Sequence, residues 1–181
     1  MLTVTERCRA FVLPLLATAL LSACASYSGR DLVPGIATQA DVVAQMGAPA
    51  MQWEDADGGR QLAYPRGPEG PHTFMVFIAP DGHVRRIENV LSERHFAGIS
   101  AGMTEAEVLR IIGPSQPQWT AFFAARDELV REWRYCDGGN VMAKFDVLFD
   151  GTSLRVRATF SRPDYRGPDS IAPTCGQVPG R

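Results

Sequence analysis

"GMTEAEVLRIIGP", residues 102–114, contains the signals for both ends of one short helix. Thr104 followed three residues later by Glu107 has the spacing of a capping box, in which each side chain accepts a hydrogen bond from the other residue's backbone N–H. Gly113 suits the left-handed position just after a helix, and Pro114 prevents a further turn. Apolar residues recur at i, i+3 and i+4 and form one face: Val108, Ile111 and Ile112. The stretch therefore predicts an amphipathic helix between Thr104 and Gly113.

An earlier stretch, "GIATQADVVAQMGAP" (residues 35–49), has the same signals in the same order. Thr38 occupies the N-cap position and Asp41 lies three residues later, where an acid stabilises a helix N-terminus. Gly47 corresponds to Gly113, and Pro49 follows within two residues. We therefore expect two helices of the same design in one chain.

Each predicted helix is followed by a similar set of strands. "TFMVFIAPDGHVRRIENV" (73–90) and "AKFDVLFDGTSLRVRATF" (143–160) each have Asp-Gly between two apolar runs, which predicts a hairpin. A further strand precedes each hairpin, at 60–64 and at 130–135. In the last strand, strict alternation predicts that four apolar side chains share one face: Leu154, Val156, Ala158 and Phe160.

Additional short ribbons are expected at 51–55 and 119–124, and a brief helix within "SERHFAGI" (92–99). The predicted fold is α+β, with two αβββ or ααβββ repeats that form an antiparallel sheet with helices on one face. A lone unit of this length buries little apolar surface, so the two are expected to share a sheet or to pack tightly.

The composition is that of a globular protein. Of 181 residues, 45% are hydrophobic and 21% are charged, and the formal net charge is −2. Lys and Arg form no cluster, so the chain offers no basic field for nucleic acid, and no nucleic-acid partner is expected.

The N-terminus has the features of an export signal. Arg7 and Arg9 precede an apolar run of 12 residues, 10–21. A membrane-spanning helix needs about 20 apolar residues, so this run is too short to span a bilayer and instead fits a secretory signal. One interpretation of residues 1–24 is an ordinary secretory signal that contains a stray cysteine.

The other interpretation rests on "LSAC" (residues 21–24), which resembles the lipobox of bacterial lipoproteins. That resemblance implies cleavage before Cys24 and covalent attachment of acyl chains to it. Ala25 and Ser26 lack the aspartate that, by resemblance to lipoprotein sorting signals, would retain the protein at the inner membrane. The expected location is the periplasmic side of the outer membrane, and the lipid on Cys24 is the only cofactor expected.

The remaining cysteines suggest a disulfide. Cys8 leaves with the signal and Cys24 is used by the lipid, which leaves Cys136 and Cys175 as one pair in an oxidising compartment. A disulfide between them would tie the Pro/Gly-rich tail to the end of a strand. Two unpaired thiols are the alternative.

The helix and strand motifs resemble a known family. The pattern G-M-T-x-x-E-V at 102–108, the W-R-Y and L-A-Y strands at 133–135 and 62–64, and F-D-G at 149–151 are similar to the SmpA/OmlA (BamE-like) lipoprotein domain. The resemblance covers about residues 30–160, twice over. It implies an outer-membrane lipoprotein with partners in the β-barrel assembly machinery. A tandem arrangement departs from BamE, which has one copy, and resembles the β-lactamase inhibitory protein, whose two ααβββ repeats form one concave sheet.

These patterns divide the chain into a predicted lipoprotein signal peptide (1–23), a lipidated tether (24–34), a first BamE-like unit (35–92), a second unit (93–161) and a Pro/Gly-rich tail (162–181).

The sequence shows no pattern of catalytic or metal-binding residues. The three histidines are far apart in sequence, and no nucleophile–base pair or ligand cluster is evident, so neither an enzyme nor a metal site is expected. "WTAFFAA" (119–125) is an apolar run outside the shared pattern. Its aromatic residues belong either to the core or to a docking surface for a partner protein or lipid: Trp119, Phe122 and Phe123.

The expected function is therefore that of a non-catalytic outer-membrane lipoprotein, similar to BamE, that supports envelope assembly through protein–protein contacts. Exposed aromatics, or Arg155 and Arg157, on the free face of the sheet would make those contacts. The alternative is a periplasm-facing inhibitor or ligand-binding module similar to the β-lactamase inhibitory protein.

Overall fold

The structure is a computed structural model that describes residues 28–165 and 171–176. The predicted signal peptide and the lipidation site Cys24 lie outside the described residues and stay predictions. Along the chain the elements are α1 (Gln39–Met46), β1 (Met51–Glu54), β2 (Arg60–Pro65), β3 (Thr73–Ile78), β4 (Val84–Asn89), α2 (Glu93–Phe96), α3 (Glu105–Ile112), η1 (Pro117–Trp119), β5 (Thr120–Phe123), η2 (Ala124–Arg126), β6 (Glu128–Cys136), β7 (Met142–Asp150) and β8 (Val156–Pro163).

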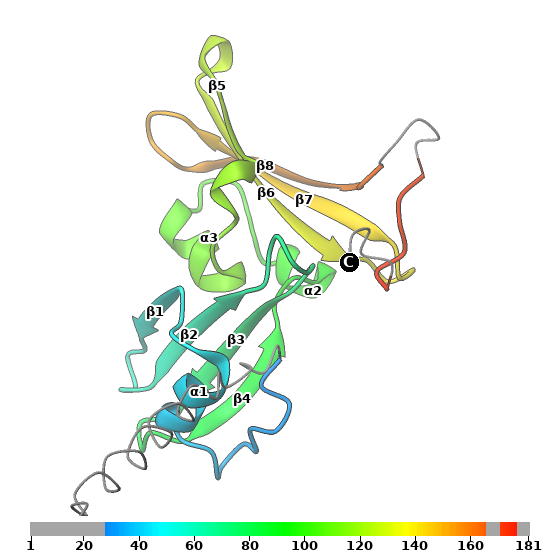
Figure 1. Cartoon of the computed structure of the whole chain (residues 1–181). Helices are drawn as coiled ribbons and strands as arrows, with labels where there is room; N and C mark the ends of the chain where they lie inside the picture. Colours follow the sequence, from blue (N-terminus) through cyan, green and yellow to red (C-terminus); the bar gives the residue numbers. More distant parts are fainter. Residues whose placement is uncertain (1–27, 166–170, 177–181) are drawn as a thin grey trace, which may run out of the picture.

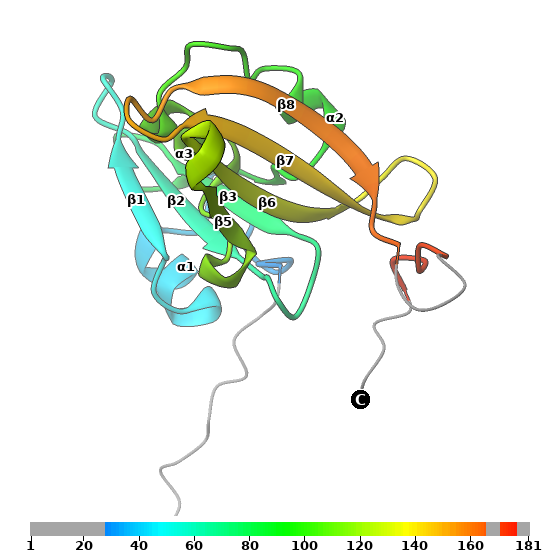
Figure 2. The ribbon, with the colours of Figure 1, turned by 90° about the horizontal axis from the view of Figure 1, so that it is seen from above.

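The fold is α+β with two four-stranded antiparallel sheets, in the strand orders β1-β2-β3-β4 and β5-β6-β7-β8. Four layers succeed one another in Figure 1: α1, the first sheet, the helices α2 and α3, and the second sheet. Figure 2 is viewed from above and shows the strands of the second sheet in front of those of the first. Helices α2 and α3 therefore lie between the two sheets.

Both predicted helices are present and both begin with the predicted cap. Thr38 Oγ1 accepts a hydrogen bond from Asp41 N, and Thr104 Oγ1 accepts one from Glu107 N, each at 3.3 Å. The carboxylate of each acid accepts the N–H of its threonine in return, which completes a capping box. These hydrogen bonds lower the pKa of Asp41 and of Glu107.

Two main clusters of buried side chains hold the layers together. The first joins α1 to one face of the first sheet and includes Leu32, Val42, Met46, Leu62, Val76 and Val84. The second joins α2 and α3 to one face of the second sheet and includes Phe96, Val108, Ile112, Trp133, Phe145 and Phe149. Leu32 belongs to the stretch 24–34 that we predicted to be a tether, and it is buried in the first cluster.

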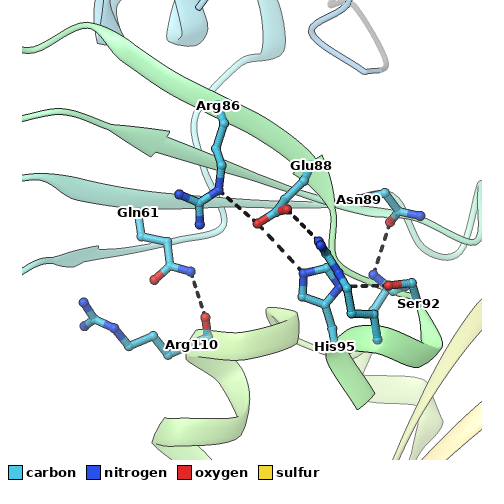
Figure 3. Close-up of polar contacts among 9 residues, drawn as sticks. Gln61, Arg86, Glu88, Asn89, Ser92, His95 and Arg110 are labelled. Carbon is cyan, nitrogen blue, oxygen red and sulfur yellow. Dashed lines mark hydrogen bonds and ion pairs between the residues drawn. The ribbon is translucent and has the colours of Figure 1, made fainter. Parts of the chain in front are cut away.

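The C-terminal end of α3 contacts both sheets. Gln61 Nε2 on β2 donates to Arg110 O at 2.8 Å (Figure 3). Arg110 Nη2 donates to Glu54 O at 3.1 Å. From the second sheet, Trp133 Nε1 donates to Gly113 O at 3.1 Å. Gly113 has a φ of +71°, and a Cβ at this position would lie 2.8 Å from Cγ2 of Thr73 on β3. Glycine here therefore permits both the backbone turn and the close approach to the first sheet.

We expected the two units either to share a sheet or to pack tightly, with helices on one face; they pack tightly, and the expected placement of the helices is wrong for the first sheet. The strands form two separate sheets, and the first sheet has helices on both faces, α1 on one and α3 on the other. The reason is that α3 buries its apolar side against the second sheet, while Arg110 and Gly113 contact the first. The short ribbons at 51–55 and 119–124 supply the fourth strand of each sheet.

The predicted common face of Leu154, Val156, Ala158 and Phe160 is also wrong. Leu154 precedes β8 and has a φ of +52°. The register then shifts, so that Val156 pairs with Phe149 while Ala158 pairs with Leu148. Because adjacent residues of a strand point to opposite faces, Val156 enters the core, whereas Ala158 lies on the outer face.

The predicted disulfide is confirmed. Cys136 and Cys175 are bonded, with their Cα atoms 5.8 Å apart. The tail is also held by its backbone, since Cys175 N donates to Asn140 O at 3.0 Å and Met142 N donates to Pro173 O at 2.8 Å. The C-terminal segment thus lies against the β6–β7 hairpin.

A candidate binding groove on the second sheet

The outer face of the second sheet, opposite α2 and α3, carries a groove of about 500 Å³. The strand register arranges its side chains in rows across β6, β7 and β8. One row holds only cations: Arg134, Lys144 and Arg162. The next row holds Glu132, Asp146 and Phe160, and the third is apolar: Val130, Leu148 and Ala158. We refer to these rows, with Phe123 and Arg126 at the edge, as the groove.

The edge strand β5 places the three candidate aromatic residues differently. Phe123 lines the groove and Phe122 does not, because neighbours on a strand point to opposite faces. Both are exposed, Phe122 by 58% and Phe123 by 43%. Trp119 lies at the end of the groove, with its ring 4.4 Å from the guanidinium carbon of Arg134. It also lies against Gly67 of the β2–β3 loop, so Trp119 contacts both halves of the molecule.

Ion pairs connect the cationic row to the acids beside it. Glu132 Oε2 lies 3.1 Å from Lys144 Nζ and accepts a hydrogen bond from Arg162 Nη2 at 2.8 Å. Arg162 Nε donates to Asp146 Oδ2 at 2.7 Å. Asp164, just after β8, lies 3.4 Å from Lys144 Nζ. The network fixes the side chains at one end of the groove.

Asp146 is, with Asp164, one of the two almost completely buried acids of this network. Burial raises the pKa of its carboxyl, and the hydrogen bond from Arg162 acts in the opposite direction. Its Oδ2 binds Arg162, but its Oδ1 has no hydrogen-bond partner among the described residues. The carboxylate therefore acts mainly as a buried counter-charge for Arg162.

Sequence analysis did not identify the charged residues of the groove. The signal was present in the alternation of β7, in which Lys144 and Asp146 alternate with Phe145 and Val147. That pattern predicts one polar and one apolar face of β7. Only the register with β6 and β8 shows that Lys144 lies beside Arg134 and Arg162. The candidates Arg155 and Arg157 do not line the groove; they donate to Gly102 O and to Asp150 Oδ2 near the β7–β8 turn.

Within the described part of the chain, no group of three or more His, Cys, Asp or Glu side chains is placed to hold a metal ion. No helix among residues 28–165 and 171–176 is long and apolar enough to cross a membrane.

Comparison with known proteins identifies no family. No family model matches the chain, and no curated protein matches its sequence. Among solved structures, an extracellular protein from Bacillus anthracis that contains an SCP domain is similar at 9% identity and a TM-score of 0.28. The similarity covers 93% of this chain and 57% of that protein, so the chain spans little more than half of its length.

Proposed function

We propose that this protein is a non-catalytic lipoprotein of the bacterial outer membrane that binds another envelope protein through the second sheet. The contact surface is the groove together with the edge strand β5. Such a protein would support assembly of the envelope by holding a partner at the membrane.

The observation that carries the proposal is the exposure of aromatic side chains in the groove and on the edge strand β5. Phe122, Phe123 and Phe160 are all more than two-fifths exposed. Two of them belong to a strand that ends the sheet, with no further strand paired to it among the described residues. Phe122 and Phe123 are neighbours on β5, and unpaired sheet edges accept extended segments of other chains, so β5 is the main element of the proposed surface.

Two features support the proposed location. The lipobox-like "LSAC" provides Cys24 for acylation, and several acyl chains, at about 0.8 kcal/mol per buried CH₂, would anchor the protein stably. The disulfide Cys136–Cys175 fits the oxidising conditions of the periplasm.

The resemblance to BamE-like domains suggests the class of partner. We propose that the two halves are copies of one such unit, since each has a threonine-capped helix, a glycine after the helix and four antiparallel strands. By that resemblance, components of the β-barrel assembly machinery are the first partners to test.

The test is affinity purification from cross-linked membranes of the bacterium that encodes the protein. The wild-type chain should recover an envelope protein, and the double variant Phe122→Ser/Phe123→Ser should lose it. Tyr165→Ser is the matched control, because Tyr165 is 62% exposed outside the groove. Equal recovery by the wild-type and double-variant chains would refute the proposed surface, and a Cys24→Ala chain that stays in the membrane fraction would refute the anchor.

A second function, a periplasm-facing inhibitor or ligand-binding module, is favoured by one observation. The groove of about 500 Å³ is within the range of 300 to 1,000 Å³ that is usual for ligand sites. The same purification separates the two functions, because recovery of a periplasmic hydrolase instead of assembly components would identify an inhibitor.

A further inference from the structure

The charges of the groove are layered, with the cations outermost. The side chains of Arg126 and Arg162 are 60% and 45% exposed. The acids that pair with them are nearly covered, since Glu128 is 11% exposed and Asp146 is 2% exposed. The charges nearly balance in number, but the surface that a partner meets is positive, because solvent and ligands reach the cations and not the acids.

The two exposed arginines also keep donors for another acceptor. Arg126 binds Glu128 through Nε and Nη2, and Arg162 binds Asp146 and Glu132 through the same two atoms. A guanidinium has five N–H donors in a planar fork. Among the described residues the Nη1 groups of both arginines have no hydrogen-bond partner, so they can donate to a carboxylate of a partner.

Apolar side chains lie between these cations. Phe123, at one edge, is stacked with Arg126, whose guanidinium carbon is 4.7 Å from the ring. Phe160 lies on β8 two residues before Arg162, and Leu148 lies on the central strand. A peptide segment that crosses the sheet from β5 to β8 would thus contact Arg126 first, then the apolar side chains of Leu148 and Phe160, and then Arg162.

We infer that the groove binds an acidic segment of the partner protein that also carries an apolar or aromatic side chain. This inference rests on the proposed function and adds the chemistry of the partner. The carboxylates of the segment bind Arg126 and Arg162, and its apolar side chain packs on Phe123, Leu148 and Phe160. A basic segment is disfavoured, because it would meet exposed cations while the acids below them are covered.

The test is selection of short peptides from a random display library on the purified full chain. Peptides that combine Asp or Glu with an aromatic or aliphatic residue should be enriched. Exposed ion pairs contribute up to about 1 kcal/mol each, so Arg126→Gln/Arg162→Gln should weaken these peptides about tenfold. Arg85→Gln is the matched control, because Arg85 on β4 is 46% exposed and lies in the other sheet.

Two further variants guard against a loss of folding. Arg126→Gln alone changes an exposed residue of η2 and should still weaken the peptides severalfold. Asp146→Asn removes the negative charge beneath Arg162 and keeps the shape of the side chain. It should strengthen peptide binding about threefold, which is within the range expected for one exposed charge pair. A purely structural role of Asp146 would instead leave affinity unchanged or lower it.

The inference is overturned by enrichment of Lys- or Arg-rich peptides, by equal affinity for wild-type and Arg126→Gln/Arg162→Gln chains, or by an empty selection. Binding to phosphatidylglycerol vesicles without any peptide binding would also overturn it in favour of a lipid surface. If no peptide is selected but the affinity purification recovers an envelope protein, only the inference of an acidic partner segment is refuted. If acidic peptides are selected but the affinity purification recovers no envelope protein, only the proposed envelope partner is refuted.

Discussion

Each half of the molecule has a threonine-capped helix followed by four antiparallel strands, but the halves differ in what covers their sheets. The first sheet has α1 on one face and contacts with α3 on the other. The second sheet has helices on one face, and its outer face forms the groove. The exposed large apolar residues of the first half are aliphatic: Val33, Ile36 and Val43. Those of the second half include four aromatics: Phe122, Phe123, Phe160 and Tyr165. The first sheet therefore has a helix against each face, whereas no helix covers the outer face of the second sheet in the part of the chain that the structure describes.

The largest effect is expected in the core of the second half, at the end of α3 that also contacts the first sheet. Trp133 is fully buried in the second sheet, and its indole N–H donates to Gly113. Trp133→Ala should lower the free energy of unfolding by about 3–5 kcal/mol, through a cavity and a lost hydrogen bond. Because α3 lies between the sheets, urea melts should show one transition for both halves. Two separate transitions would show that the halves are independent.

The helix-ending glycines give the sharpest comparison between the halves. Gly47 and Gly113 both have positive φ with ψ near 180°, a region that almost only glycine adopts, and alanine there costs about 1–3 kcal/mol. A Cβ on Gly47 would meet nothing within 4 Å, whereas one on Gly113 would lie 2.8 Å from Thr73. Gly113→Ala should therefore destabilise by about 1–3 kcal/mol more than Gly47→Ala, as overpacking does. Equal losses in urea melts would contradict the close packing of α3 on the first sheet.

Sequence reasoning succeeded where the determinant was local. The capping boxes at Thr38 and Thr104 each depend on residues three apart, and the disulfide depended on cysteine count and compartment. It failed where the determinant was distant. That α3 contacts two sheets depends on Arg110 meeting Gln61, which is 49 residues away. The groove depends on how β6, β7 and β8 pair with one another, and the sequence of one strand does not specify that register.

The caps should show a smaller effect, equal in the two halves. Thr38→Ala and Thr104→Ala each remove the side-chain acceptor of a capping box, which typically costs about 1 kcal/mol. Thermal or urea melts of the two variants measure it. A cap that matters in only one half would show that the two helices are not equivalent in stability.

The smallest effect concerns pH and the contact between β4 and α2. His95 on α2 is mostly buried, its Nδ1 lies 2.8 Å from Ser92 Oγ, and Glu88 on β4 lies 3.9 Å from its Nε2 (Figure 3). Burial lowers the pKa of His95; Arg94 and Arg86 act in the same direction, and Glu88 opposes them.

The unfolded chain, with a histidine pKa of about 6.5, then binds more protons than the folded chain below that pH. Stability should be fully present above pH 6.5 and should decline as pH falls through the lowered pKa. His95→Gln should reduce this slope in melts between pH 5 and 7. Part of the slope should persist, because burial also lowers the pKa of His72. An unchanged slope in His95→Gln would contradict the assigned role of His95.

The most direct test of the central claim, that the groove and the edge strand β5 form the contact surface, is hydroxyl-radical footprinting of the full chain. Labelling of Phe122, Phe123 and Phe160 is compared between the purified protein and isolated outer membranes, with the exposed Tyr165 as an internal reference. The account predicts that all three phenylalanines are labelled in the purified protein and protected in the membranes, while Tyr165 is labelled equally in both. Equal labelling of the phenylalanines in both samples would contradict it.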